Sequence, residues 1–221
     1  MNIIFIAPPA AGKGTLSDKL VSKYDYKHLS TGDLLRAEIK KKSDLGKRID
    51  KIISKGELVS DEIITELLKN ELQKIKKEKF ILDGYPRNIT QAKTLSKLFA
   101  ELEISDYVAI YLDIKEELAM KRALGRIICS KCGASYNTYF ENFMPRKEGI
   151  CDKCGSELQH RVDDTEETFK KRFITYIEVT SPVLDYYKEM NKLQIIDANY
   201  ESDDVFKVVE QILDDGNVDN K

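Results

Sequence analysis

The first fifteen residues constrain the fold of this 221-residue chain more than any other stretch. Residues 3–6 form an unbroken run of β-branched and aromatic side chains, which is typical of a strand buried on both faces of a parallel sheet. A loop of small residues follows, and Gly12-Lys13-Gly14-Thr15 opens a helix. The start of a helix presents unpaired N–H groups, and small residues let an anion approach them. We therefore predict a nucleotide site at residues 7–15.

This loop departs from the P-loop pattern of Gly, four residues and Gly-Lys-Ser/Thr. Position 7 is Ala instead of Gly, and the hydroxyl comes one residue late, at Thr15. Glycine-rich turns between a strand and a helix also occur without a ligand, so the motif alone leaves that alternative open. Its place directly after a buried strand favours the nucleotide site.

Charge and composition limit the partners. Lys plus Arg (36) nearly balances Asp plus Glu (38), and the net charge of −2 gives no general attraction to nucleic acid or anionic membrane. The chain has no apolar run of about 18 residues and no basic segment before its apolar start. We therefore expect a cytoplasmic protein with neither a nucleic-acid nor a membrane partner.

Arginine is scarce, because only eight of the 36 basic residues are Arg. Since lysine is the usual surface cation of this chain, an arginine is favoured where a planar, bidentate donor to phosphate is needed. For Arg48 and Arg146 we prefer ordinary surface salt bridges.

The rest of the pattern predicts strands alternating with helices, which is typical of a doubly wound parallel sheet. Ser30 and Asp164 are expected to begin helices, the latter in a capping box with Glu167. Segment 31–59 has too few apolar positions for a core of its own and is expected to form a small movable flap. The expected strands are 26–29, 79–83, 107–113 and 193–197, and the expected helices are 13–24, two within 31–59, 61–77, 89–102, 115–124, 161–188 and 203–213.

Asp83 ends a predicted buried strand and is followed by a turn. In a doubly wound sheet this position lies beside the phosphate loop, where a carboxylate can hold Mg²⁺ through water. Asp-Gly alone indicates only a turn, but together with the loop it predicts a second part of one site. Arg122 and Arg126 are four residues apart and share one side of a helix. Arg161 and Arg172 would also share a side if one helix carried both.

Two Cys-x-x-Cys pairs occur between residues 127 and 160, and eighteen residues separate them. This spacing predicts a tetrahedral zinc site, ahead of free thiols or a redox pair. Four thiolates leave no open coordination position, so the zinc would be structural. Acidic and basic residues balance in this insert, which makes it a poor binder of a phosphate backbone. We assign no role to His28 or His160. The predicted zinc ligands are Cys129, Cys132, Cys151 and Cys154.

Several motifs together resemble the adenylate kinase family, in its long form with a zinc-bearing lid, over essentially the whole chain. They are GKGT at 12–15, STGDLLR at 30–36, ELV at 57–59, LDGYPR at 82–87 with Gln91, GR at 125–126 and RVDDTEETFKKR at 161–172. The resemblance implies a P-loop nucleoside-monophosphate kinase fold, with a five-stranded parallel sheet and helices on both faces. It implies a core of residues 1–29, 60–126 and 161–221, an NMP-binding flap of residues 30–59 and a zinc-ribbon lid of residues 127–160.

The resemblance also implies an activity, namely reversible Mg²⁺-dependent conversion of ATP and AMP into two ADP by a monomer that serves adenine nucleotide homeostasis. The implied catalytic residues are Lys13, Asp83, Arg87, Arg122, Arg126, Arg161 and Arg172. The implied ATP-binding residues are Ala10, Ala11, Gly12, Lys13, Gly14, Thr15, Arg126, Ser135, Tyr136 and Ala198. The implied AMP-binding residues are Thr31, Arg36, Glu57, Leu58, Val59, Gly84, Tyr85, Pro86, Arg87, Gln91, Arg161 and Arg172.

Ala7, Ala10 and Ala198 stand where the family pattern usually has Gly. If position 10 needs a positive φ, alanine there costs on the order of 1 kcal/mol and weakens ATP binding. Three alternatives stay open. They are a kinase for another nucleoside monophosphate, a P-loop ATPase that acts on a partner, and a nucleotide-binding or zinc-ribbon interaction protein. In the last of these, Ala7 and Ala10 would weaken catalysis.

Overall fold

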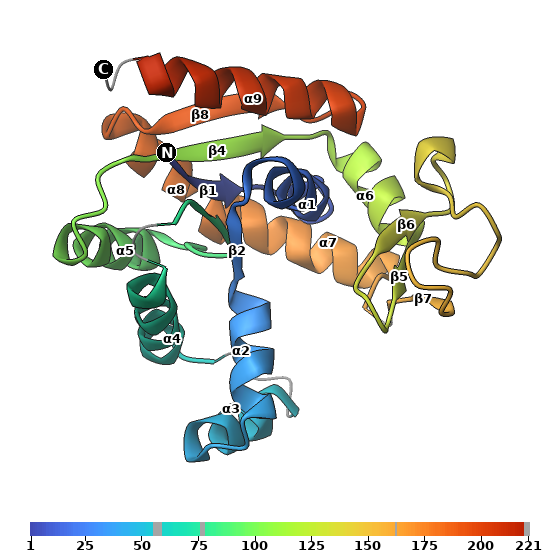
Figure 1. Ribbon diagram of the computed structural model, residues 1–221, viewed down its shortest axis with the longest axis horizontal. Helices are drawn as coiled ribbons and strands as arrows, with labels where there is room; N and C mark the ends of the chain where they lie inside the picture. Colours follow the sequence, from blue (N-terminus) through green and yellow to red (C-terminus); the bar gives the residue numbers. More distant parts are fainter. Residues whose placement is uncertain (55–58, 76–77, 162, 219–221) are drawn as a thin grey trace.

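The computed structural model describes residues 1–54, 59–75, 78–161 and 163–218. Its centre is a five-stranded sheet in the order β2-β3-β1-β4-β8, in which every neighbouring pair is parallel (Figure 1). This sheet confirms the α/β fold expected from the sequence. The strands are β1 (Asn2–Ile6), β2 (Lys27–Ser30), β3 (Phe80–Asp83), β4 (Tyr107–Asp113) and β8 (Leu193–Asp197).

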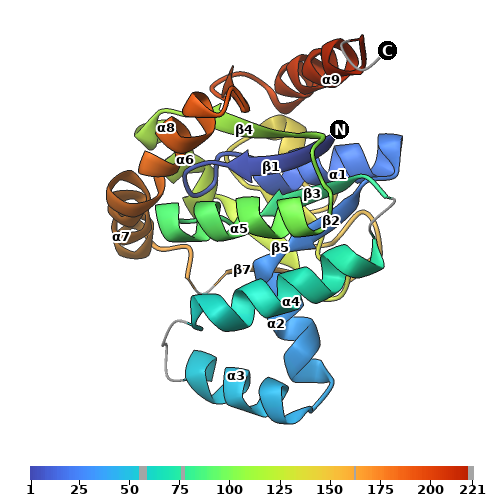
Figure 2. The ribbon, with the colours of Figure 1, turned by 90° about the vertical axis from the view of Figure 1, so that its left-hand side faces the viewer.

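Helices cover both faces of the sheet (Figures 1 and 2). Side chains of β1 alternate between two cores, as the period of a strand requires, because Ile3 packs into one cluster and Ile4 into the other. The first cluster receives side chains from α1 (Lys13–Tyr24), α6 (Glu116–Leu124), α7 (Glu166–Thr175) and α9 (Ser202–Val218). The second receives side chains from α4 (Asp61–Lys74), α5 (Ile89–Glu101) and α8 (Pro182–Glu189).

The strand order places the predicted site at one edge of the sheet. The carboxyl ends of parallel strands share an edge, and β1 lies between β3 and β4, where the winding changes direction. Phe5 of β1 is the register partner of Asp83 at the end of β3. The phosphate loop that follows β1 therefore emerges beside Asp83.

Two short helices project from the sheet, α2 (Thr31–Lys40) and α3 (Asp44–Ser54), where the sequence predicted a flap (Figure 1). Their small apolar cluster contains Ile49 and Val59, and α4 contributes Leu67 to it. Leu68, the next residue of α4, packs into the main core. Because α4 serves both clusters, the flap boundary at residues 59 and 60 stays a prediction.

Residues 126–160 form a separate small sheet in the order β6-β5-β7, with antiparallel pairs. A few apolar side chains pack around Cys129 and Cys151, so these two cysteines lie at the centre of this unit, whereas Cys132 is exposed. A β-carbon at Gly125 would lie 2.3 Å from Oδ1 of Asn137, so the entry to the lid needs glycine. The elements are β5 (Arg126–Cys129), β6 (Ser135–Asn137), a 3-10 turn η1 (Glu141–Phe143) and β7 (Leu158–His160).

The single helix predicted over residues 161–188 is wrong. α7 begins only at Glu166, a π-helical turn η2 (Tyr176–Thr180) follows, and α8 begins at Pro182. Proline lacks an N–H group, so it suits the first turn of a new helix better than the interior of a long one.

One predicted helix cap is wrong, and the other is confirmed in position only. Thr165 caps α7, because its Oγ1 accepts the N–H of Thr168, and Asp164 binds an arginine instead. Ser30 stands at the cap position of α2, but its side chain makes no cap hydrogen bond.

Other helix ends differ by a few residues. α4 ends at Lys74, and the last two residues of the predicted helix, 76 and 77, lie outside the described residues. α9 begins one residue earlier than predicted and continues to Val218. None of the described helices combines the length and the apolar character that crossing a membrane requires.

Candidate active site

The loop between β1 and α1 forms an anion cradle. The first turn of α1 has no side-chain cap and no acidic residue, so its positive dipole end is available to a ligand. Gly12 has a φ of 102°, and Ala10 has a φ of 59°. Position 10 therefore has the positive φ on which the predicted cost of alanine depends, and alanine places a β-carbon there.

Lys13 bends back over this loop. Its Nζ donates to the carbonyl oxygen of Ala7 at 3.2 Å and reaches that of Pro8 at 3.5 Å. Burial lowers the pKa of Lys13, and the nearby carboxylate of Asp83 opposes that effect. A cation held over an open phosphate cradle suits the outer phosphates of a nucleotide.

One cavity of about 600 Å³ extends from the cradle to the lid. All ten residues that the resemblance predicted to bind ATP line this cavity, and they come from both the core and the lid. Asp83, Arg122, Arg161 and the flap residue Arg36 line the same cavity. The ten residues are Ala10, Ala11, Gly12, Lys13, Gly14, Thr15, Arg126, Ser135, Tyr136 and Ala198.

Carboxylates hold three of the predicted phosphate-binding arginines. Arg126 makes a bidentate pair with Asp164, with Nε–Oδ2 at 2.7 Å and Nη2–Oδ1 at 2.5 Å. Asp163 receives both Arg161 and Arg172, at 3.0 Å and 2.5 Å from its Oδ2. This planar, forked geometry is the one with which guanidinium groups bind phosphate. The carboxylates therefore hold these guanidinium groups in fixed orientations.

Arg122 is held differently, by backbone carbonyl groups. Its Nη1 donates to Ala198 O at 3.1 Å and its Nη2 to Tyr200 O at 3.2 Å. Burial lowers the pKa of Arg122, and Glu201 opposes this shift. Backbone carbonyl groups carry no full negative charge, so they do not neutralise this guanidinium. Its positive charge is therefore available to a ligand.

Asp83 and His28 lie together at the floor of the cavity. The His28 Nε2 is 3.6 Å from the Asp83 Oδ2, and the contact raises the pKa of His28 against the effect of burial. Burial raises the pKa of Asp83, but His28 and Lys13 outweigh it, so the net pKa lies below the ordinary value. Asp83 is therefore a carboxylate at neutral pH, and its oxygens are the ligands that Mg²⁺ prefers.

Four of the predicted AMP-binding residues form one hydrogen-bonded group, although none of the four lines the cavity. Gly84 O accepts from Thr31 Oγ1 at 3.3 Å and from Arg87 Nε at 2.8 Å. The Gln91 Oε1 accepts the N–H of Arg87, and its Nε2 donates to Asp61. Gln91 is 6% exposed, and among the described residues one amide hydrogen and one lone pair of its side chain have no hydrogen-bond partner.

The other residues predicted to bind AMP make separate contacts in different parts of the structure. Arg36 bonds Asp33 at the surface of the flap, Tyr85 is buried against Thr65, and Pro86 follows Tyr85. Val59 is buried in the flap cluster. Glu57 and Leu58 lie outside the described residues, so their predicted contact with AMP has no structural counterpart here.

The four cysteine sulfurs of the lid lie within 4.8 Å of one another. A tetrahedral zinc with bonds of about 2.3 Å separates its sulfurs by about 3.8 Å, which fits this cluster. Hydrogen bonds from Ser156 lower the pKa of Cys154 to about 6. The N–H of Ala134 favours the Cys132 thiolate, but burial and the other sulfurs outweigh it and raise its pKa to about 12. Four thiols this close need a cation to ionise together.

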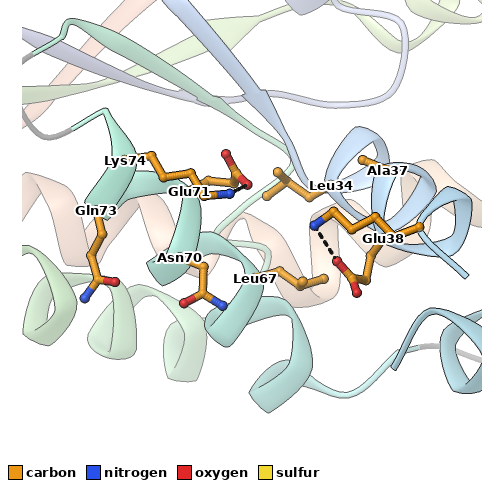
Figure 3. A pocket seen from close by; sticks show the side chains of 9 residues that line it. Leu34, Ala37, Glu38, Leu67, Asn70, Glu71, Gln73 and Lys74 are labelled. Atoms are coloured by element: carbon orange, nitrogen blue, oxygen red, sulfur yellow. Dashed lines mark hydrogen bonds and ion pairs between the residues drawn. The ribbon is translucent and has the colours of Figure 1, made fainter. Parts of the chain in front are cut away.

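A second cavity, of about 410 Å³, lies between α2 and α4 (Figure 3). It is lined by two ion pairs, Glu38 with Lys41 and Glu71 with Lys74. None of the predicted nucleotide-binding residues lines it.

The parallel sheet, the loop after β1 and the carboxylate at the end of β3 define a mononucleotide-binding protein of the P-loop class. Comparison with known proteins is more specific. The family model for adenylate kinase matches residues 5–192. The chain therefore belongs to the adenylate kinase family.

Similar proteins cover the chain almost completely. It is 42% identical over 214 residues to an adenylate kinase of Thermosipho melanesiensis, covering 96% of this chain and 99% of that protein. It is 39% identical over 214 residues to one of Clostridium tetani, with 96% and 98% coverage. It is 41% identical over 217 residues to one of Enterococcus faecalis, with 97% and 100% coverage.

Sequence reasoning missed three residues of the site. Asp163 and Asp164 hold arginines, and His28 lies beside Asp83. The strand register contains a signal for the histidine, since His28 is the partner of Ile81 and Asp83 lies two residues further on the same face. Without the register, two residues 55 positions apart show no relation.

Proposed function

We propose that this chain catalyses reversible transfer of the γ-phosphoryl group of Mg-ATP to AMP, giving two ADP. Family membership supports the activity, and one observation supports the assignment of residues. The ten predicted ATP-binding residues share a cavity with Asp83, three further arginine side chains and the phosphate cradle. ATP would lie on residues 10–15 and against Ser135, Tyr136 and Ala198.

AMP would lie on the flap side of the same cavity. The group formed by Thr31, Gly84, Arg87 and Gln91 follows the cavity residue Asp83 through Gly84, and Arg36 lines the cavity from the flap. Arg161 and Arg172 share one carboxylate and would meet the phosphates between the two nucleotides. Both guanidinium groups donate hydrogen bonds to Asp163, so a bound phosphate would have to compete with this carboxylate.

The reaction requires no general base, because the attacking phosphate oxygen of AMP is already ionised at neutral pH. Catalysis is then alignment of the two nucleotides plus neutralisation of charge in a loose transition state. Lys13 and the arginines supply positive charge, and Asp83 would hold Mg²⁺ through water. The bound Mg²⁺ would act as a Lewis acid and stabilise negative charge on the phosphoryl group that is transferred.

The flap and the lid would close before chemistry, because water could otherwise attack ATP. The four lid cysteines would hold a structural zinc, as in the long-form type of lid. We further propose that the enzyme works as a monomer in the cytoplasm. The balanced charge of the chain supports the absence of a nucleic-acid partner.

A coupled assay of ADP formation, with zinc quantified on the same sample, tests this proposal. We expect ADP from ATP plus AMP, less from ATP plus GMP, CMP or UMP, and about one zinc per chain. A preference for another monophosphate would assign the chain to a different acceptor. ATP binding with no ADP formation would support the alternative that Ala7 and Ala10 weaken catalysis.

A further inference from the structure

Tyr136 belongs to both the nucleotide cavity and the cysteine cluster. It lies on β6, opposite Ile127 of β5, and it lines the cavity that contains the phosphate cradle. Its hydroxyl oxygen is 3.6 Å from Cys151 Sγ and 2.8 Å from the backbone nitrogen of Asp152. One side chain thus connects the predicted ATP wall to a predicted metal ligand.

The direction of these two hydrogen bonds follows from the atoms involved. A backbone N–H can only donate, so the Tyr136 oxygen accepts the bond from Asp152. The phenolic hydrogen then remains for the Cys151 sulfur. Metal binding makes that sulfur a thiolate, which is a stronger acceptor than a thiol.

We propose that Tyr136 is a positioning residue whose hydroxyl donates to the metal-bound Cys151 thiolate, so that the metal fixes the ATP-side wall of the cavity. The inference rests on the proposed nucleotide site and the proposed metal site. Groups that hydrogen-bond to metal ligands orient them, and losing such a partner costs about 10- to 100-fold in metal affinity. Metal retention should therefore depend on the Tyr136 hydroxyl, and ATP binding should depend on the metal.

The test compares Tyr136→Phe with the wild-type chain after reconstitution of both with Co²⁺. A hydrogen bond stabilises the sulfur electrons, so we expect its loss to move the sulfur-to-cobalt charge-transfer band to longer wavelength. We also expect a chelator to remove the metal about 10- to 100-fold faster. Tyr139→Phe is the matched control, because Tyr139 is an exposed tyrosine of the same lid. Its spectrum and metal release should match those of the wild type.

A KM comparison separates this role from a general loss of lid stability. In Tyr136→Phe we expect a higher KM for ATP and an unchanged KM for AMP, and chelation of the wild type should produce the same pattern. An unshifted band with wild-type metal release in Tyr136→Phe would overturn the inference. Equal rises in both KM values would also overturn it.

Different experimental results would contradict the proposed function and this inference. A wild-type chain that binds Co²⁺ through four thiolates but forms no ADP would contradict the proposed function alone. A wild-type chain without a thiolate-to-metal band would contradict the metal site, and the role of Tyr136 would fall with it.

Discussion

Ala10 has a φ of 59°, in the left-handed region where a β-carbon crowds the following carbonyl group. An L-residue there costs roughly 1–2 kcal/mol relative to a right-handed conformation. The methyl group also stands in a cradle whose purpose is to let phosphate approach the backbone. The chain therefore has a strained residue and a narrower approach at one position of its proposed ATP site.

Replacing Ala10 with Gly should relieve both effects. We expect the free energy of unfolding to rise by up to about 1 kcal/mol, because part of the relief is offset by the entropy of glycine in the unfolded chain. ATP should bind more tightly, as measured by isothermal titration calorimetry. Ala11→Gly is the control, since Ala11 is buried and has no positive φ, and it should destabilise the protein. Equal or tighter ATP binding by the wild type would contradict this interpretation.

The arginine pairs show how single residues are prepared for phosphate. Asp164 has a side chain only 3% exposed and binds Arg126 through two hydrogen bonds. Holding a guanidinium in one orientation before the ligand arrives reduces the ordering that binding must impose. The carboxylates therefore contribute to preorganisation.

At the scale of elements, the flap depends on close contact between α2 and α3. A β-carbon at Gly46 would lie 2.4 Å from the carbonyl oxygen of Glu38, which no real contact allows. This oxygen belongs to the backbone, so a larger residue must move one helix. Glycine at position 46 thus sets the distance between the two flap helices.

Gly46→Ala should force these helices apart. We expect a loss of about 1–3 kcal/mol in the free energy of unfolding, as for other overpacked sites. The KM for AMP should rise more than the KM for ATP, because the flap carries Arg36 and Thr31 while the phosphate cradle stays intact. Lys47→Ala, an exposed neighbour on α3, should leave both constants unchanged. A larger rise in the KM for ATP than in the KM for AMP would contradict the proposal that the flap binds AMP and the phosphate cradle binds ATP.

Glu38, at the end of α2, makes flap stability depend on pH. Hydrogen bonds from Lys41 at 2.7 Å and Ser43 at 2.6 Å lower its pKa below the ordinary 4.5. Because the folded state favours the charged form, this stabilisation is complete above about pH 4.5 and is lost as the pH falls through the folded pKa. The stability difference between wild type and Glu38→Gln should therefore shrink below pH 4.5.

Urea unfolding from pH 3 to pH 7 measures this difference. Glu117→Gln, which changes an exposed glutamate of α6, serves as the control and should show a smaller pH dependence. A wild-type advantage over Glu38→Gln that stays constant down to pH 3 would show that the carboxylate is not stabilised by its partners.

The sequence predicted some elements well for physical reasons. The bounds of β4 and β8 match the predicted strands, because their apolar runs end at Asp113 and Asp197. All ten residues predicted to bind ATP line the large cavity, whereas the predicted catalytic residues Arg87 and Arg172 do not. The π-helical turn between α7 and α8 was missed, because residues 176–180 contain no glycine or proline that would mark it. Contacts across the sheet, such as His28 with Asp83, depend on a register that periodicity does not reveal.

At the scale of the whole molecule, three parts meet at one cavity. The sheet supplies the cradle and Asp83, the flap supplies Arg36, and the lid supplies Ser135 and Tyr136. Residues far apart in the chain thus contact the same space, and small movements of the flap or the lid would change all of these contacts. This arrangement accounts for a reaction between two bound nucleotides without a catalytic base.

The most direct test of this account follows the γ-phosphoryl group itself. Wild-type protein is mixed with ATP labelled in the γ-phosphoryl group, with and without AMP, and the products are separated. The account predicts that label enters ADP only when AMP is present, with little inorganic phosphate in either sample. Labelled inorganic phosphate formed equally fast without AMP would contradict it, because the site would then activate water.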